Sequence, residues 1–221
     1  MCIKMILPTQ EQINNSKQVN VWDFGNTILY DLCRKNFYHI DDEKIVAKVL
    51  FIGRIYAAAV ERRRNKKDGI NDDFYIETIV PTFRESKLDD LLEELSAYKQ
   101  LSVDSISPVL QVHYYLTNLL KKITNLEKRS FCSKYLHFHL PDLFFIYDSR
   151  AVIGLRQFTS RVPKDLKECL KPEDIDIEYA KFFLKSFDTK RHIEDHYHTR
   201  ITNRQLDNIL IDLANKRINN N

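Results

Sequence analysis

The chain has 221 residues, of which 43% are hydrophobic, 29% charged and 11% aromatic, a composition typical of a globular protein and unlike that of a disordered one. Only four glycines and six prolines occur, which disfavours folds with many tight turns and argues against glycine-rich phosphate loops. Basic residues exceed acidic residues by 34 to 31, and a net charge of +3 indicates no particular partner. The composition therefore favours a largely helical protein.

The cysteines are widely spaced and form no C-x-x-C pair. This spacing predicts neither a disulfide framework nor a zinc site, and reduced thiols are expected in a cytoplasm. No apolar run is long enough for a signal peptide or a membrane span. We therefore expect a cytoplasmic protein that has no membrane partner, and the sequence indicates no cofactor.

Charge is distributed unevenly along the chain. Residues 71–104 carry nine acids and three bases, whereas residues 111–164 carry nine bases and three acids. A basic surface suits a polyanion such as nucleic acid. The alternative is that both stretches are solvated faces of helices.

Helical periodicity begins near the N-terminus. The pattern predicts a helix over residues 20–37 and a second, longer helix from Asp41 toward Gly69, with acids at its start and bases at its end. A short amphipathic helix is predicted over residues 87–100, after Ser86.

Two helices are predicted next, over residues 109–123 and 130–140. The connection between them is short, so we expect them to fold against each other as a hairpin. An extended apolar run follows at residues 143–147, and Asp148 with Ser149 is placed to cap a further helix.

The C-terminal third is also predicted to be helical, over residues 173–187 and 204–217. No internal repeat and no linker rich in Pro, Gly or Ser divides the chain. We therefore predict a single all-α domain over residues 1–221, with a division into two lobes as the alternative.

The order of helix, short turn, Lys128, helix, extended segment, Asp148 and helix resembles the helix-hairpin-helix DNA glycosylase superfamily. The stretch KRSFCSKYLHFHLPDLFFIYDSRA is most similar to the 8-oxoguanine DNA glycosylases, and the likeness covers residues 109–156. In that family a catalytic lysine opens the second hairpin helix, and an aspartate about twenty residues later begins the next helix. The resemblance implies a glycosylase-like helical bundle that excises a modified guanine, such as 8-oxoguanine, from DNA.

Asp148 is the first candidate catalytic residue. Breaking an N-glycosidic bond develops positive charge on the sugar, so the site needs an anion fixed beside C1′. A carboxylate that accepts backbone N–H groups at a helix N-terminus is favoured in its charged form. The alternative is that Asp148 is a helix cap and nothing more, which would stabilise the fold by about 1 kcal/mol.

Lys128 is the candidate nucleophile, because a lysine amine can attack the same sugar carbon and form a Schiff base. It must be partly neutral for this, which desolvation or the neighbouring Arg129 would promote. The alternatives are a solvated Lys128, a nucleophile at Lys134, or alignment of Arg129 with the family's lysine, which would leave no covalent step. We also place Arg129 and Lys134 among the residues predicted to bind substrate or DNA.

Two further residues complete the predicted substrate and DNA contacts. Arg150 follows the candidate aspartate where a phosphate or base edge would lie, or else forms a surface ion pair. His139 is included as well, although it and His137 lie on opposite sides of a helix and one of the two is expected inside. His192 and His196 have the helical spacing of metal ligands, but no third ligand is fixed by spacing, and no metal is predicted.

The hairpin departs from the family at its turn. Glycines normally precede the catalytic lysine and expose backbone amides to a DNA phosphate, whereas this chain has residues 123–127, ITNLE, at that place. This favours a second hypothesis, a non-catalytic protein that binds a modified purine or a protein partner. Because relatives of this type occur in antiphage operons, the resemblance also raises a role in antiviral defence. A helical scaffold in an oligomer is a third alternative.

Overall fold

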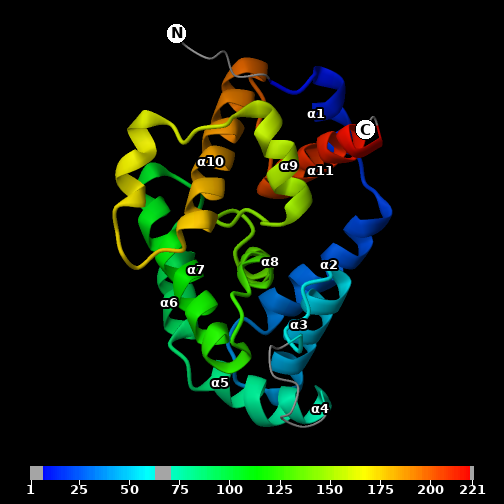
Figure 1. Cartoon of the computed structure of the whole chain (residues 1–221). Helices are drawn as coiled ribbons and strands as arrows, with labels where there is room; N and C mark the ends of the chain where they lie inside the picture. The colour runs from blue at the N-terminus through cyan, green and yellow to red at the C-terminus, as the bar shows by residue number, and fades with distance from the viewer. Residues whose placement is uncertain (1–6, 63–70, 220–221) are drawn as a thin grey trace. The chain divides into compact units, whose positions relative to one another are not determined.

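The computed structural model describes residues 7–62 and 71–219, and these residues contain helices but no β-strand (Figure 1). The all-α prediction is therefore confirmed for the described part of the chain. The chain divides into two compact units: unit 1 comprises Met1–Val19 and Phe145–Asn221, and unit 2 comprises Asn20–Phe144. The boundary between the units could not be predicted, because no stretch rich in Pro, Gly or Ser lies near residue 19 or residue 145, where the chain passes from one unit to the other.

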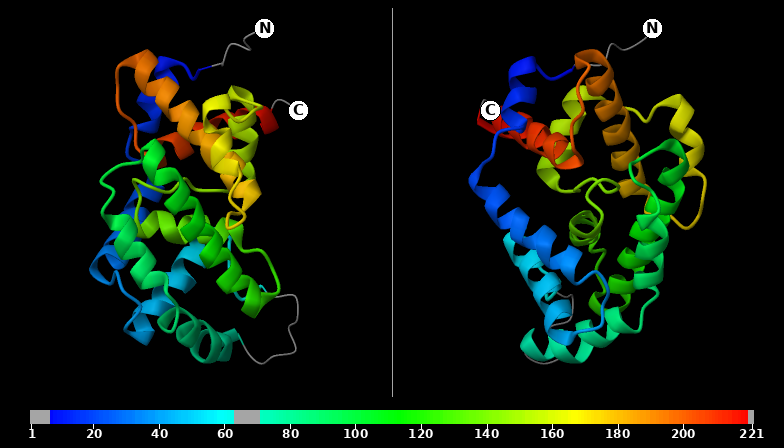
Figure 2. Two further views of the ribbon diagram at one scale, coloured as in Figure 1. Left: turned by 90° about the vertical axis from the view of Figure 1, so that its left-hand side faces the viewer. Right: turned by 180° about the vertical axis from the view of Figure 1, so that it is seen from behind.

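Unit 2 is built around one buried helix. Every residue of α8 from Phe131 to His139 is buried, and α2, α3 and α7 pack against it (Figure 2). The predicted glycosylase-like segment, residues 109–156, begins at Val109 after the first two turns of α7 and includes the hairpin of α7 and α8. Its last part, from Phe145 onward, belongs to unit 1. The elements of this unit are α2 (Val21–Lys35), α3 (Asp42–Ile55), α4 (Asn71–Asp73), the π-helical η1 (Phe74–Ile79), α5 (Val80–Arg84), α6 (Leu88–Ser96), α7 (Val103–Thr124) and α8 (Arg129–His139).

The long helix predicted from Asp41 is wrong beyond Ile55. Ala57 adopts a left-handed backbone with φ of 53°, and Ala58 N–H donates to the carbonyl of Gly53 at 2.8 Å. The chain thus folds back on α3, and a Cβ on Gly53 would lie 3.2 Å from the Cα of Ala59. The run of alanines gave no stop signal, because alanine is a strong helix former. The remainder of the predicted helix, residues 63–69, lies outside the described residues.

Unit 1 joins the N-terminal helix to the C-terminal third of the chain. Its elements are α1 (Gln10–Ser16), α9 (Ser149–Phe158), the 3-10 helix η2 (Lys164–Leu170), α10 (Ile177–Tyr197) and α11 (Asn203–Asn219). Helices α9 and α11 pack most closely, at Gly154, where a Cβ would lie 2.0 Å from the carbonyl oxygen of Leu210. Glycine is therefore required at this position for the two backbones to approach.

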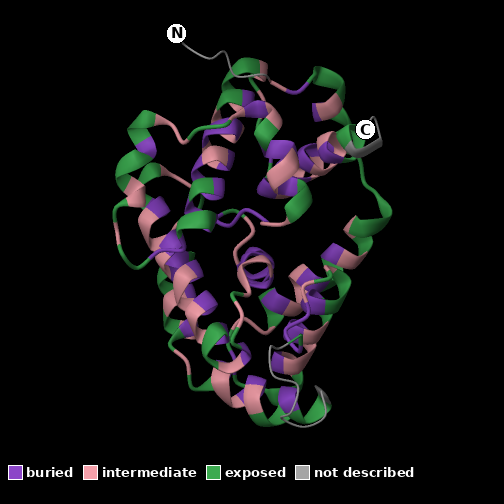
Figure 3. Cartoon of the chain, viewed as in Figure 1, coloured by how far each residue is buried: buried purple, intermediate pink, exposed green. Residues whose placement is uncertain are grey.

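Helix α2 and the α-helices from α6 to α11 lie where the sequence predicts them, although α10 runs ten residues beyond its predicted end at residue 187. Helix α1, the segment of α4, η1 and α5, and the 3-10 helix η2 were not predicted. The missed elements are short, so periodicity had too few residues to register. Buried and exposed side chains alternate around the surface helices of each unit (Figure 3). No helix in residues 7–62 and 71–219 combines the length and the apolar character needed to cross a bilayer.

Candidate functional site

Asp148 is the N-cap of α9, as predicted. The chain reaches it in an extended conformation, with φ of −151° and ψ of 175°, and its Oδ1 accepts the N–H of Ala151 at 2.8 Å. The side chain is half-buried. The structure thus fixes a carboxylate at the N-terminus of a helix, where the backbone dipoles favour negative charge.

Arg150 lies one residue into α9, beyond Ser149, and its side chain is exposed. Within the described part of the chain it forms no hydrogen bond or ion pair, so the surface ion pair considered from the sequence does not form there. A guanidinium group in this position is available to an external anion.

Lys128 immediately precedes α8, and its amine is held by the segment that follows α3. The Nζ atom donates to the carbonyl of Ala59 at 3.1 Å and to that of Arg62 at 2.5 Å. Burial lowers the pKa of Lys128, the charge of Arg62 lowers it further, and Glu61 opposes both. A neutral amine keeps two N–H groups for these carbonyls and a lone pair for reaction. The lowered pKa agrees with what a nucleophile needs, but its cationic neighbour is Arg62 and not Arg129.

The turn of the hairpin satisfies its own backbone. Asn125 takes the left-handed conformation, with φ of 55°, and its N–H donates to Lys121 O at 2.9 Å. The N–H of Leu126 donates to the Thr124 hydroxyl at 3.2 Å. Because these two amides are already bonded, they do not point at a ligand as the glycine-rich turns of the family would.

Charged side chains around the turn also neutralise one another. Glu127 forms ion pairs with Lys121 at 3.0 Å and with Arg129 at 3.2 Å. The guanidinium of Arg129, which the sequence predicts to contact substrate or DNA, thus forms an ion pair with an acid two residues away. These ion pairs also reduce the repulsion that the carboxylate of Glu127 would exert on a nearby phosphate.

Two of the predicted contact residues are buried. Lys134 is 2% exposed, and its amine donates to the Ser130 hydroxyl at 2.8 Å. His139 is 6% exposed, its Nδ1–H donates to Tyr135 O at 2.8 Å, and its Nε2 accepts from the amine of Lys48 at 3.3 Å. Neither position fits the predicted contact with substrate or DNA, because both side chains are enclosed in unit 2. Sequence periodicity could not predict that these two side chains are buried, because α8 is buried on nearly every face and so lacks the usual alternation of apolar and polar faces.

A hydrogen-bonded network that the sequence did not reveal lies beside His139. His39 donates from Nδ1 to the Asp89 carboxylate, which also accepts the backbone N–H of His39 at 2.9 Å. The Nε2 atom of His39 accepts the Tyr135 hydroxyl at 2.5 Å. His39 and Tyr135 are no more than 1% exposed. The arrangement resembles a catalytic relay in its order, but it has no access to solvent at His39 or Tyr135, so we assign it to the core.

The same network contains Lys48, whose side chain is fully buried. Its amine donates to Asn36 O at 2.8 Å, and burial lowers its pKa from 10.5 to about 8. Burial also lowers the pKa of His139 well below its usual value, and the charge of Lys48 adds to this effect. For Asp89, burial acts to raise the pKa, but the hydrogen bonds from His39 outweigh it and the pKa is lowered. The imidazole of His139 is therefore neutral, and its Nε2 accepts a hydrogen bond from the amine of Lys48.

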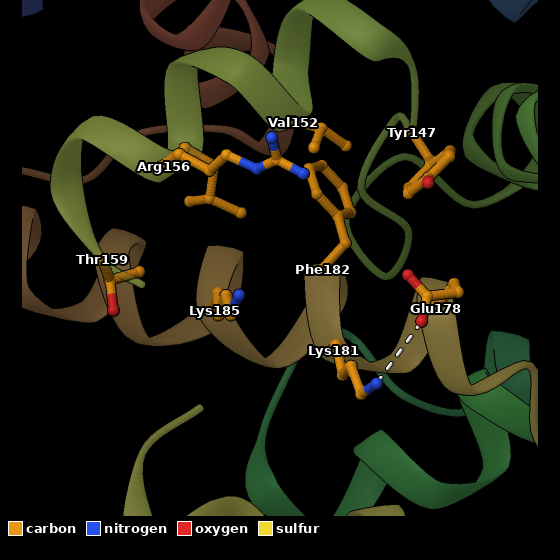
Figure 4. A pocket seen from close by; sticks show the side chains of 9 residues that line it. Tyr147, Val152, Arg156, Thr159, Glu178, Lys181, Phe182 and Lys185 are labelled. Atoms are coloured by element: carbon orange, nitrogen blue, oxygen red, sulfur yellow. Dashed lines mark hydrogen bonds and ion pairs between the residues drawn. The ribbon is translucent and has the colours of Figure 1, made fainter. Parts of the chain in front are cut away.

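Unit 1 has a surface pocket that begins one residue before Asp148. The pocket has a volume of about 100 Å³ and lies between α9 and α10 (Figure 4). Its lining residues are Tyr147, Val152, Leu155, Arg156, Thr159, Glu178, Lys181, Phe182 and Lys185. Arg156 belongs to the basic stretch over residues 111–164, but no motif in the sequence marks it as a contact residue. The other cations of the pocket, Lys181 and Lys185, lie on α10. Their spacing of four residues places them on one face of a helix, which was the only sequence signal for this part of the pocket.

The histidines considered as metal ligands lie at the end of α10. His192 donates from Nδ1 to the carbonyl of Asp188 at 2.8 Å, and His196 lies in the last turn of the helix. In the ranges that the structure describes, no three His, Cys, Asp or Glu side chains are grouped to hold a metal ion.

Lys128 belongs to unit 2 and Asp148 to unit 1, so the structure describes each residue within its own unit. No protein-family model, curated protein or solved structure matches the chain. The likeness to the glycosylase superfamily thus rests on the sequence pattern alone.

Proposed function

We propose that the chain is a DNA N-glycosylase that excises a modified guanine such as 8-oxoguanine. The observation that carries the proposal is the Asp148 carboxylate, held at the N-terminus of α9 after a helical hairpin and an extended segment. This is the order of elements in which the family places its catalytic aspartate. Several bases of residues 111–164 are paired or buried, but Lys122, Arg150 and Arg156 are exposed and supply positive charge for a DNA substrate.

In the proposed reaction the bond between C1′ and the base nitrogen breaks, and its electron pair leaves with the base. Positive charge develops on the sugar, and the carboxylate of Asp148 stabilises it electrostatically. Water, or the neutral amine of Lys128, then forms the new bond to C1′ and loses a proton to solvent or to the departing base. With the amine as nucleophile, ring opening gives a Schiff base, and elimination of the 3′ phosphate then cuts the strand.

Burial at Lys128 supports its role as the nucleophile, because a lowered pKa increases the fraction of neutral amine at neutral pH. The two carbonyls that hold the amine would also orient it. In an enzyme without this covalent step, Lys128 would instead be a structural residue that fastens the segment after α3 to the start of α8.

The test uses an oligonucleotide that contains one 8-oxoguanine, with chromatography of the released base and borohydride trapping of a covalent adduct. We expect the wild type to release the base and Asp148→Asn to slow release at least 100-fold, as for removal of a key electrostatic group. Lys128→Gln should abolish trapping. Asp142→Asn, which removes an exposed acid six residues earlier, is the matched control and should leave both unchanged.

Absence of base release from this substrate and from oligonucleotides with other modified guanines would contradict the enzymatic proposal. Release that Asp148→Asn leaves intact would contradict the role of the carboxylate. Release without trapping would remove Lys128 from the mechanism while leaving Asp148 in it.

The internally bonded hairpin turn favours a second candidate, a protein that binds a modified purine without excising it. The amides of Asn125 and Leu126 are occupied, so the usual grip on duplex DNA is missing. Such a protein would gain thermal stability from free 8-oxoguanine, and the gain would keep rising with the logarithm of the ligand concentration above Kd. It would show little affinity for duplex DNA in fluorescence anisotropy, whereas the enzyme should bind DNA with a steep dependence on salt.

A further inference from the structure

The pocket between α9 and α10 is enriched in positive charge. Arg156, Lys181 and Lys185 line it, and Glu178 is the single acid among its lining residues. Lys181 pairs with Glu178 at 3.4 Å, which leaves two cations to be balanced (Figure 4). The side chains of Arg156 and Lys185 form no hydrogen bond or ion pair with any residue in the described ranges.

The cations of the pocket repel one another. Burial lowers the pKa of Lys185, and the charges of Arg156 and Lys181 lower it further. Lys185 is half-buried, so it faces the pocket with part of its hydration removed. An anion between these side chains would relieve the repulsion and supply the missing hydrogen-bond acceptors.

Most of the remaining lining residues have apolar or aromatic side chains, and Thr159 adds a hydroxyl group. Phe182 is 5% exposed and Leu155 is 3% exposed, and they close the inner side of the pocket. The ring of Tyr147 meets that of Phe182 edge to face, with centroids 5.1 Å apart. An apolar wall beside two cations suits a ligand that joins an anionic group to a sugar or a flat ring.

Size limits what the pocket can enclose. Its volume of about 100 Å³ is below the ~300 Å³ at the lower end of pockets that enclose a whole small molecule. It therefore suits one small group of a ligand whose other parts extend into solvent. The planar fork of an arginine and the point charge of a lysine are the usual partners of a phosphate.

We propose that this pocket binds a phosphate group, carried by a free nucleotide or by a nucleic acid strand, with Arg156 and Lys185 as its contacting cations. Arg156 lies eight residues after Asp148 on the same helix, which corresponds to about 12 Å along its axis. The pocket thus provides a phosphate contact that the hairpin turn, with its occupied amides, does not. The inference does not depend on catalysis, because a non-catalytic nucleotide-binding protein would use the same contact.

Four probes test the proposal by calorimetry and fluorescence anisotropy: inorganic phosphate, deoxyguanosine 5′-monophosphate, deoxyguanosine, and a labelled 12-nucleotide single strand. The variant is Arg156→Gln combined with Lys185→Gln. Its matched control, Lys164→Gln combined with Lys167→Gln, removes two exposed charges from η2 of the same unit, which do not line the pocket. Thermal melting of each variant checks that it is folded.

We expect the pocket variant to bind the phosphate-bearing probe about 100-fold more weakly, near tenfold for each lost contact to a charged group. The control should bind within about twofold of the wild type, and deoxyguanosine should bind no better to the wild type than to the variant. If the strand is the ligand, the slope of log K against log salt should fall in magnitude by about 1.4 on loss of two phosphate contacts.

Binding of the mononucleotide and of inorganic phosphate without the strand would identify a free ligand, and binding of the strand far above the mononucleotide would identify nucleic acid. Equal binding by the pocket variant and the control, or no binding of any phosphate-bearing probe to the wild type, would overturn the proposal. Asp148→Asn should retain phosphate binding, so a failure of the proposed glycosylase activity and a failure of this site give different results.

Discussion

The ionisable side chains of unit 2 and those of the pocket in unit 1 differ in how their charges are satisfied. In unit 2, Lys48 and His39 are enclosed, and each is held in hydrogen bonds: Lys48 donates to Asn36 O, and His39 accepts from the Tyr135 hydroxyl. In unit 1, Arg156 and Lys185 line an open pocket and have no such partner in the described residues. A buried polar group is tolerated when it is bonded, whereas unpaired cations gathered at a surface are stabilised by an external anion. The first arrangement maintains a fold, and the second offers a binding site.

The largest expected effect concerns the framework that carries the pocket. Gly154→Ala would place a Cβ 2.0 Å from the carbonyl oxygen of Leu210, so the backbones of α9 and α11 must separate. We expect a loss of about 3 kcal/mol or more in the free energy of unfolding, at the upper end of the cost of overpacking. Urea denaturation followed by circular dichroism measures it.

Gly25→Ala is the matched control in unit 2, because a Cβ at Gly25 meets nothing within 4 Å. Alanine should stabilise α2 by about 0.5–1 kcal/mol through helix propensity. If Gly154→Ala lowers the free energy of unfolding by no more than about 0.5 kcal/mol, then α9 and α11 pack less closely than the structure describes.

The buried network of unit 2 should give the next largest effect. Asp89→Ala removes the acceptor for the Nδ1–H and the backbone N–H of His39, and both donors would lose their partner. We expect a cost of about 2–3 kcal/mol, since unsatisfied buried donors are expensive. Asp89→Asn keeps an acceptor oxygen and should cost less. Equal, small losses in both variants would show that water replaces the carboxylate and that the network is not closed.

A smaller effect concerns the pH dependence of stability through Lys48. Its pKa is lowered from 10.5 to about 8 in the folded protein, so the unfolded chain binds more protons between these values. Stability therefore rises with pH above 8, by about 1 kcal/mol between pH 8 and pH 9 from this group. Below pH 8 Lys48 is charged in both the folded and the unfolded state, so the full free-energy cost of burying its ammonium group is present.

Lys48→Met should lack this rise. Burial raises the pKa of the Cys33 thiol to about 12, so this group makes the free energy of unfolding fall as the pH rises above 9. Subtracting the pH profile of the variant from that of the wild type separates the contribution of Lys48 from that of Cys33. Chemical denaturation at pH 7, 8 and 9 provides the comparison. Parallel pH profiles for the two proteins would contradict a buried, destabilised ammonium group.

The sequence predicted what local patterns determine. The hairpin of α7 and α8 and the cap at Asp148 follow from periodicity, from a short connection and from residue types with known positional preference. The left-handed Ala57 has no such signature, so the end of α3 was missed. Chain reversals of this kind depend on tertiary contacts, here the approach of the backbone to Gly53.

Among the candidate site residues, too, those fixed by local patterns could be predicted and those brought together by tertiary contacts could not. Asp148 could be identified because one helix N-terminus fixes it, whereas the network of His39, Asp89 and Tyr135 joins residues separated by 50 and 96 positions. His139 and Lys134 were assigned to a surface because neither periodicity nor charge shows that a helix is buried on nearly every face. The pocket cations come from two helices, and sequence spacing relates Lys181 to Lys185 but neither of them to Arg156.

The most direct test of the central claim is the single-turnover rate of base release from an 8-oxoguanine oligonucleotide by wild type, Asp148→Asn and Asp148→Ala. Asparagine retains a cap acceptor, so Asp148→Asn should be as stable as the wild type within about 0.5 kcal/mol, and Asp148→Ala should lose about 1 kcal/mol. If the carboxylate stabilises a sugar cation, both variants should release the base at least 100-fold more slowly. Full activity in Asp148→Asn would show that this side chain caps α9 and does nothing further.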